Sequence, residues 1–145
     1  MLRVVLDVSI FISYLLTPYS SGAAVEVIYR GWKEECTMLI SDPLMEELRD
    51  VATTSEYVGE RVDSLSLQKF LRELVLLGEQ VDFGEKRIWP GLRDADDAYL
   101  LEMAVVGEAD CLVSGDKGVL EMAGRLPGLH VVTPARFLAM LEGTQ

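Results

Sequence analysis

The chain has 145 residues, half of them hydrophobic, and a formal net charge of −11. This length predicts a single domain over residues 1–145 with a real core, and the absence of low-complexity tracts excludes a disordered protein. The negative charge argues against a general nucleic-acid coating protein, which would be basic, but it is compatible with a nuclease whose acids hold cations.

Two features of the sequence concern the location of the protein. No uninterrupted apolar run reaches the roughly 18 residues of a membrane span, and the N-terminus lacks a signal-peptide pattern. The two cysteines, Cys36 and Cys111, lack the spacing of a metal site. We therefore expect a cytoplasmic protein with reduced cysteines and no membrane association.

Short aliphatic runs alternate with amphipathic segments along the chain. The runs predict strands over 3–6, 37–40, 80–83, 110–113 and 129–132. The amphipathic segments predict helices over 11–16, 23–32, 44–51, 65–77, 95–108, 119–123 and 134–141. Asp42 is expected as the N-cap of the third, and Asp94 can cap the fifth. This alternation predicts an α/β protein with a three-layer α/β/α architecture, in which helices cover both faces of a parallel sheet.

The helix expected over 65–77 carries a wide apolar face. That face is wider than one core contact needs, and it is formed by Leu67, Phe70, Leu71, Leu74, Val75 and Leu77. Extra apolar area of this kind is typical of a homodimer interface or of a deeply packed helix. Both interpretations remain open on the sequence alone.

Two aspartates follow predicted strands. Asp7 comes directly after the strand at 3–6, and Asp116 comes shortly after the strand at 110–113. If these two strands are neighbours, both aspartates lie at the topological switch point, where open parallel sheets bind ligands. Asp116 can instead cap the short helix that follows it.

Two further acids lie beside the apolar stripes of predicted helices. Asp97 shares a helix face with Leu101, so it enters the core stripe at its N-terminal end, whereas Glu102 is expected to point elsewhere. Glu47 lies at the edge of the inward stripe of the third helix, and Glu46 points to solvent. Burying a carboxylate is costly unless a cation or hydrogen bonds offset the desolvation, although an acid in a first helical turn is also favoured by the helix dipole.

Together, Asp7, Glu47, Asp97 and Asp116 form a candidate metal site. Like charges held close together raise one another's pKa, and a hard divalent cation relieves that repulsion. Oxygen ligands without sulfur or imidazole favour Mg²⁺ or Mn²⁺, which activate water for attack on phosphate esters. His130, the single histidine, has no partner acid at motif spacing, which argues against serine–histidine and cysteine–histidine catalysis.

Four stretches of the chain resemble the PIN domain family, and most closely its VapC-like ribonuclease toxins of toxin–antitoxin systems. These stretches are VVLDVSIFIS, SDPLMEEL, RDADDAYLLEMAVVGEADCLVSGDKGVL and VVTPARFL. The resemblance covers nearly the whole chain in the right order and spacing. It implies the strand order 3-2-1-4-5, Mg²⁺- or Mn²⁺-dependent cleavage of single-stranded RNA, a homodimer and an inhibiting antitoxin partner.

The resemblance also implies roles for individual residues. Asp7, Glu47, Asp97 and Asp116 match the metal-binding acids of the family. Asp94 matches a commonly acidic position beside the site, and Ser114 matches a hydroxyl residue that hydrogen-bonds the carboxylates. Two positions depart from the family: Ser9 stands where an asparagine is usual, and Gly118 stands where many members have a second aspartate. Both departures would weaken metal binding.

The resulting hypothesis is a metal-dependent endoribonuclease built on the four acids. Ser9 and Ser114 would orient carboxylates or metal waters, and Arg93 and Lys117 would contact phosphates. The main alternative is a PIN-fold binding module without turnover. A phosphohydrolase of the haloacid-dehalogenase type needs a second aspartate where Ser9 stands, and a response-regulator receiver needs an acidic pair beside Asp7 that is absent.

Overall fold

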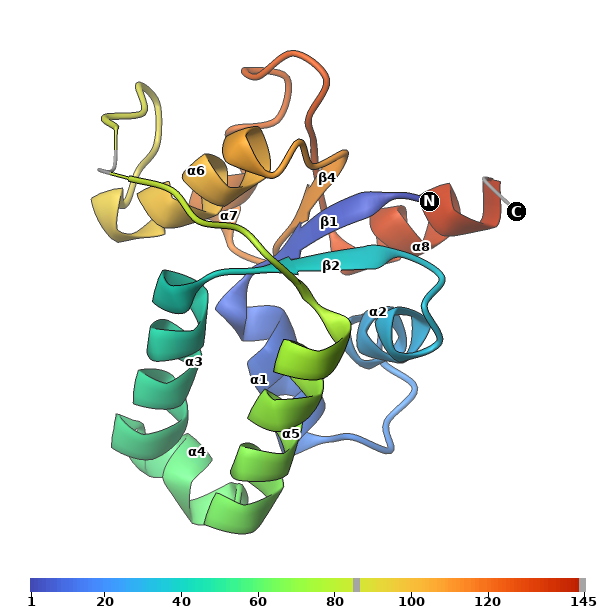
Figure 1. Ribbon diagram of the computed structural model, residues 1–145, viewed down its shortest axis with the longest axis vertical. Coiled ribbons are helices and arrows are strands. Elements are labelled where there is room, and N and C mark those ends of the chain that lie inside the picture. The colour runs from blue at the N-terminus through green and yellow to red at the C-terminus, as the bar shows by residue number, and fades with distance from the viewer. Residues whose placement is uncertain (85–86, 144–145) are drawn as a thin grey trace.

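The structure is a computed structural model that describes residues 1–84 and 87–143, and within these residues the strands form a five-stranded parallel sheet (Figure 1). The order β3-β2-β1-β4-β5 confirms the predicted fold class. The strands are β1 (Arg3–Leu6), β2 (Thr37–Ile40), β3 (Glu79–Gln80), β4 (Cys111–Val113) and β5 (His130–Val132). The inner strands β1, β2 and β4 are short, aliphatic and almost fully buried, as a sheet covered on both faces requires, whereas the edge strand β3 is exposed.

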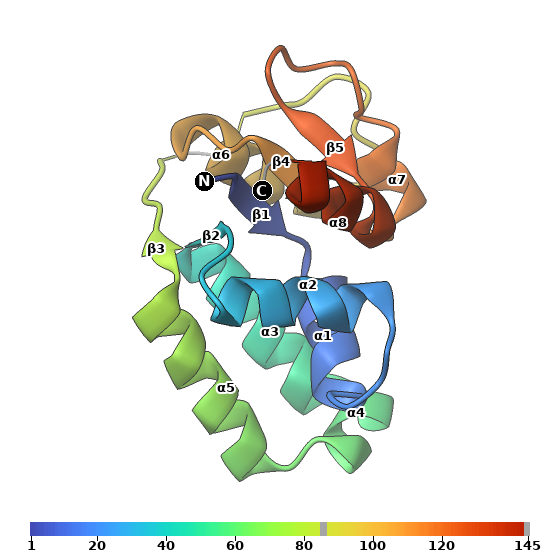
Figure 2. The same ribbon diagram turned by 90° about the vertical axis from the view of Figure 1, so that its right-hand side faces the viewer.

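Helices cover both faces of the sheet. They are α1 (Val8–Leu16), α2 (Ala23–Trp32), α3 (Asp42–Thr54), α4 (Glu56–Arg61), α5 (Ser64–Leu77), α6 (Ala98–Val106), α7 (Lys117–Leu120) and α8 (Pro134–Gly143), with a 3₁₀ turn, η1 (Ala95–Asp97), before α6. Helix α6 packs on β1 and β4 from one side, while α8 packs on β4 from the other side and against α2 (Figure 2). The central strands β1 and β4 therefore lie in the interior.

The register of β1 and β4 fixes the edge where the candidate site lies. Leu6 pairs with Val113, and the backbone N–H of Asp7 donates to the carbonyl of Val113 at 3.0 Å. The backbone leaves the sheet at this level after each of the two strands, into α1 after β1 and toward α7 after β4. Side chains that directly follow the two strands consequently share one edge of the sheet.

Helices α3, α4 and α5 form a helical arm, residues 42–77, that extends from the sheet beside α1 (Figure 1). The ring of Phe70 anchors the arm, because it lies 6.0 Å from the Phe11 ring, 5.3 Å from the Tyr14 ring and 5.7 Å from the Trp32 ring, centroid to centroid. Burying an aromatic cluster of this kind stabilises the fold through both area and ring geometry.

Three local predictions were wrong. The N-cap of α3 is Ser41, not Asp42, because the buried Ser41 hydroxyl reaches the N–H of Leu44 at 3.2 Å. Strand β3 was expected over 80–83 but covers only Glu79–Gln80, after which the backbone makes one more bond from Val81 N to Ile40 O. The helix expected over 95–108 begins instead as a 3₁₀ turn and α6 starts at Ala98, whereas the expected cap at Asp94 is confirmed.

Glu102 was also predicted to point away from the core, and it is buried. Its carboxylate receives hydrogen bonds from Arg87 at 2.8 and 3.0 Å, which lowers the pKa of Glu102. The reason for the error is that α6 is covered on nearly all sides rather than on one stripe, as its almost continuous apolar sequence allows. An acid on such a helix requires a partner, and Arg87 supplies it.

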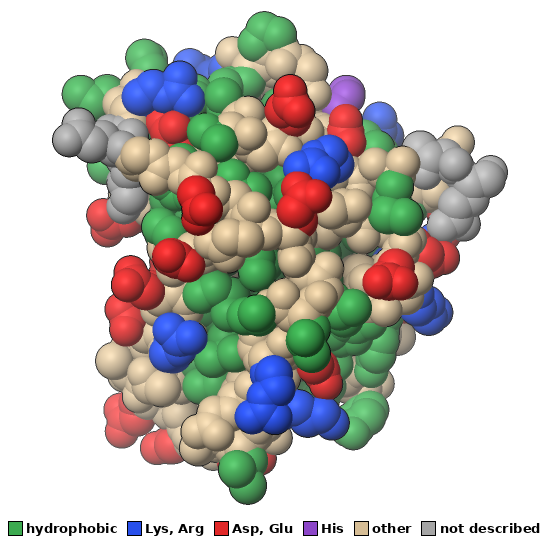
Figure 3. Space-filling view, in the orientation of Figure 1, with side chains coloured by type: hydrophobic (Ala, Val, Ile, Leu, Met, Phe, Trp, Pro, Cys, Tyr) green, Lys and Arg blue, Asp and Glu red, His purple; other side chains and the backbone are tan. Residues whose placement is uncertain are grey.

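The wide apolar face of α5 is only partly covered. Leu67, Phe70 and Leu74 are buried in the core, whereas Val75 and Leu76 are exposed. Figure 3 shows hydrophobic side chains on the surface over α5, interleaved with basic ones. The exposed part is compatible with a homodimer interface, which stays a prediction.

Two further expectations concern the cysteines and the membrane. Both cysteines are buried free thiols, and desolvation raises the pKa of Cys36 to about 11 and that of Cys111 to about 12, so both are unreactive. Within residues 1–84 and 87–143, no helix combines the length and the apolar character needed to cross a membrane.

Candidate metal centre

Asp7 and Ser114 form the floor of the candidate site, at the ends of β1 and β4. The Asp7 carboxylate is only 8% exposed, and the fully buried Ser114 hydroxyl donates to its Oδ2 at 2.6 Å. Desolvation raises the pKa of Asp7, and the hydrogen bonds from Ser114 and from the N–H of Ser9 partly oppose that rise. The strand ends therefore hold the Asp7 carboxylate where its hydrogen bonds do not fully offset the cost of burying its charge.

Asp116 joins this floor through Ser114. The backbone N–H of Asp116 donates to the Ser114 hydroxyl at 2.9 Å, so one serine is bonded to both aspartates. Oδ2 of Asp116 accepts from the N–H of Val119 at 3.1 Å and caps α7, which is why that helix begins before the predicted residue 119. The capping interpretation of Asp116 holds, and Oδ1 has no hydrogen bond to any residue that the structure describes. A capping carboxylate of this kind can still bind a ligand through its second oxygen.

Asp97 is the point where the negative charges converge. It is the last residue of η1 and half-buried, and its pKa is raised to about 7 by desolvation and by the charges of Asp7, Asp94, Asp116 and Glu47. Each of these named neighbours is an acid. The structure thus brings the four predicted carboxylates within electrostatic range of one another, from the ends of two strands, one 3₁₀ turn and one helix.

Glu47 reaches the site from α3, and Tyr99 holds it. The Tyr99 side chain is buried, and desolvation raises the pKa of its hydroxyl, helped by a hydrogen bond to the Glu47 carboxylate and by the charges of Glu47, Asp7 and Asp97. Tyr99 was not among the residues expected at the site. The available signal was a tyrosine in an otherwise apolar helix, since a buried phenol normally needs a hydrogen-bond partner.

The supporting residues surround the acids in different ways. Ser9 is exposed and contributes its backbone N–H to Asp7, and Asp94 caps η1 by accepting from the N–H of Asp96 at 2.9 Å. Arg93 forms an ion pair with Glu121, and Lys117 is exposed at the start of α7. In the described part of the chain, Lys117 makes no ion pair.

The donor set fits a hard divalent cation. Its members are all carboxylate and hydroxyl oxygens, and the acids carry more charge than their surroundings compensate. Among residues 1–84 and 87–143, no three acidic, histidine or cysteine side chains already lie in the positions of a finished metal cage. Mg²⁺ does not require one, because it keeps several waters and binds through one or two carboxylates together with phosphate oxygens.

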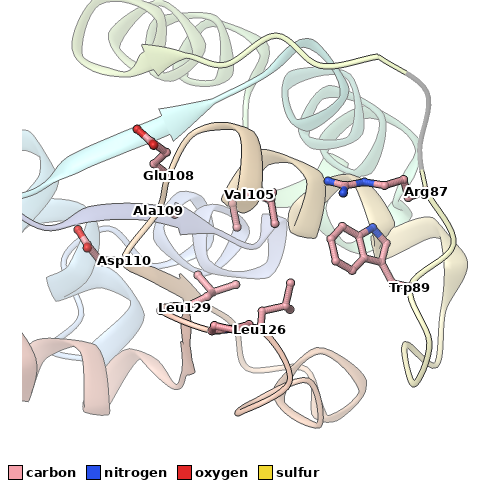
Figure 4. A pocket seen from close by; sticks show the side chains of 11 residues that line it. Arg87, Trp89, Val105, Glu108, Ala109, Asp110, Leu126 and Leu129 are labelled. Atoms are coloured by element: carbon pink, nitrogen blue, oxygen red, sulfur yellow. The ribbon is translucent and has the colours of Figure 1, made fainter.

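A separate pocket of about 520 Å³ lies between the loop after β3 and the segments that precede β4 and β5 (Figure 4). Arg87, Trp89, Val105, Leu126 and Leu129 are among its lining residues, and the Arg87 guanidinium lies 4.8 Å from the centre of the Trp89 ring. None of the four acids lines this pocket. The pocket lies where β4 and β5 begin, whereas Asp7 and Asp116 lie where β1 and β4 end, so this cavity is separate from the acids.

Comparison with known proteins identifies the relatives of this fold. Residues 3–118 match the PIN domain family, and this match includes all four acids. No curated protein sequence matches the chain significantly. A chain in the crystal structure of VapBC2 from Rickettsia felis bound to a DNA fragment from their promoter has a TM-score of 0.55 and 17% identity, covering 91% of this chain and 98% of that one. The crystal structure of PAE2754 from Pyrobaculum aerophilum has a TM-score of 0.56 and 15% identity, covering 98% of this chain and 90% of that one.

Proposed function

The chain belongs to the PIN domain family, whose members are generally nucleases, and from this premise we propose that it is a metal-dependent endoribonuclease that cleaves single-stranded RNA. The observation that carries the proposal is Asp97, whose pKa is raised to about 7 by burial and by four surrounding acids. Acids gathered in this way destabilise a fold, so they indicate a cation-dependent function.

In this proposal, Asp7, Glu47, Asp97 and Asp116 hold one or two Mg²⁺ or Mn²⁺ ions. When bound, the ion supplies an activated water and stabilises the negative charge that develops on the scissile phosphate. The protein contributes position: Ser114 fixes Asp7 and the turn that carries Asp116, while Tyr99 holds Glu47. To hold the ion, Asp97 would have to be ionised, because a ligand carboxylate cannot keep its proton.

We further propose that the protein is the cytoplasmic toxin of a toxin–antitoxin pair. The motivation for this setting is the similarity in fold to a chain in the crystal structure of VapBC2 from Rickettsia felis. The exposed Val75 and Leu76 on α5 offer apolar area for a homodimer. The alternative function is a PIN-fold binding module without turnover, which is favoured by Ser9 and Gly118 at positions where other members carry metal-site residues.

The experiment that tests the proposal is cleavage of a fluorescently labelled single-stranded RNA in Mn²⁺, in Mg²⁺ and in EDTA. We expect cleavage with either cation and none in EDTA, and a DNA strand of the same sequence should remain intact. The Asp7→Asn variant, purified in parallel, controls for contaminating ribonuclease. Equal cleavage in EDTA, or equal cleavage by the variant, would reject the assignment. Absence of cleavage together with no Mn²⁺ binding in the millimolar range or tighter would favour the binding module.

A further inference from the structure

Arg93 lies beside the acids, and its guanidinium is already paired with another carboxylate. Its Nη2 donates to Oε1 of Glu121 at 2.5 Å, and the Arg93 side chain is 61% exposed. Arg93 immediately precedes the Asp94–Asp97 segment, and Glu121 directly follows α7, which Asp116 caps. This ion pair therefore joins the two chain segments that carry Asp97 and Asp116, two of the four acids.

Gly118 allows Arg93 to lie so close to Asp116. A Cβ placed on Gly118 would lie 3.1 Å from Oδ2 of Asp116 and 3.3 Å from Cβ of Arg93, closer than side chains normally approach. The aliphatic stem of Arg93 thus crosses the glycine backbone next to Asp116 before its guanidinium turns to Glu121. A larger residue at position 118 would push either Arg93 or Asp116 away.

The backbone that precedes Arg93 is held in place separately from this ion pair. Gly91 has a φ of +88°, and a Cβ there would overlap Nη1 of Arg125, because the Arg125 guanidinium packs directly over the glycine. Nε of Arg125 also donates to the carbonyl of Glu121 at 3.3 Å. The Arg93 side chain can consequently change partner while its main chain stays against the segment after α7.

We propose that Arg93 binds a backbone phosphate of the RNA strand next to the acids, and that Glu121 occupies Arg93 in the free protein, so that carboxylate and phosphate compete for one guanidinium. The inference rests on the proposed nuclease function. Carboxylates and phosphates both match the planar fork of arginine. An exposed ion pair is weak, so a phosphate held at the acids by other contacts displaces Glu121 at little cost.

The competition has a consequence that simple charge removal does not share. Replacing Glu121 by glutamine frees Arg93, and RNA binding at low salt should tighten roughly two- to fivefold, the worth of one exposed pair. Replacing Arg93 by glutamine should weaken binding and reduce the slope of log affinity against log salt concentration by about 0.7, the loss of one phosphate contact on a single strand. When Arg93 is already glutamine, Glu121→Gln has no guanidinium left to release and should change the RNA affinity very little.

The test is a double-mutant cycle on RNA binding, read by fluorescence anisotropy of a labelled single-stranded RNA in EDTA. The wild type, Glu121→Gln, Arg93→Gln and the double variant are compared at several salt concentrations. Glu142→Gln is the matched control, because it removes the same charge from the Arg30–Glu142 ion pair (2.7 Å) at the end of α8. Thermal melts of all variants check the fold.

Binding in EDTA separates this inference from the nuclease proposal, which the cleavage assay tests on its own. The expected result is a gain from Glu121→Gln that disappears in the Arg93→Gln background and is absent from the control. An equal gain in RNA affinity with and without Arg93 would mean that only the net charge matters. That result would overturn the proposal that Glu121 and phosphate compete for Arg93. Unchanged binding by Glu121→Gln, or no RNA binding by the wild type, would overturn it as well.

Discussion

Asp97→Asn is expected to lower kcat/KM for RNA cleavage on the order of a thousandfold, a loss of about 4 kcal/mol in transition-state stabilisation, while raising the melting temperature of the metal-free protein. The two effects have one cause. Asp97 is the carboxylate on which the charges of Asp7, Asp94, Asp116 and Glu47 act. Removing its charge removes a cation ligand and also relieves the repulsion that the metal-free fold must tolerate.

Asp96→Asn is the matched control for this prediction. Asp96 lies next to Asp97 in η1, is exposed, and loses the same charge on substitution. Cleavage rates with Mn²⁺ and thermal melts in EDTA should separate the two variants, with Asp96→Asn close to the wild type in both. The assignment of Asp97 would be wrong if its asparagine variant cleaved within threefold of the wild type, or if Asp96→Asn were equally damaged.

The metal-free protein is expected to be more stable at pH 5.5 than at pH 8. The pKa of Asp97 is raised to about 7 from 3.8, so between these two pH values the folded protein takes up a proton that the unfolded chain does not. Stability from this group is full below the unfolded pKa and is lost as the pH rises through about 7. One such group contributes about 1–2 kcal/mol across this interval after allowance for solvent screening.

Urea unfolding in EDTA at the two pH values measures this effect. The lower limit of pH 5.5 stays above the range in which Asp63, Glu79 and Glu102, whose pKa values are lowered, begin to lose their stabilisation. Most of the pH dependence should vanish in Asp97→Asn and persist in Asp96→Asn. A wild type that is equally stable at both pH values would contradict the charge crowding on which the site depends.

The sequence was sufficient for the layout of the sheet and for the expectation that the four acids lie near one another, for an identifiable physical reason. Each buried strand is a short aliphatic run, and residues that directly follow parallel strands lie at one edge. Asp7 and Asp116 could therefore be placed together without coordinates, and the helical period separated Glu47 from Glu46. The cap at Ser41 was missed because Ser41 and Asp42 are both good capping residues, and only the backbone geometry distinguishes them.

Contacts between distant segments could not be predicted. The pairs Arg87–Glu102 and Arg93–Glu121 each depend on the path of the segment between β3 and η1, which has no periodic pattern. Tyr99 was overlooked for a related reason. Helix α6 was expected to bury only one stripe, so Tyr99 was not expected to be buried with a hydrogen-bond partner for its hydroxyl. Periodicity identifies the face of an element, whereas the partner across the molecule is a property of the fold.

The most direct measurement of the central claim is titration calorimetry of Mn²⁺ into the wild type and into Asp97→Asn. We predict that the wild type binds Mn²⁺ with a Kd in the millimolar range or tighter, that binding releases protons near neutral pH, and that the variant binds at least about tenfold more weakly. A wild type that takes up no Mn²⁺, or a variant that binds it equally well, would mean that these carboxylates do not hold the ion.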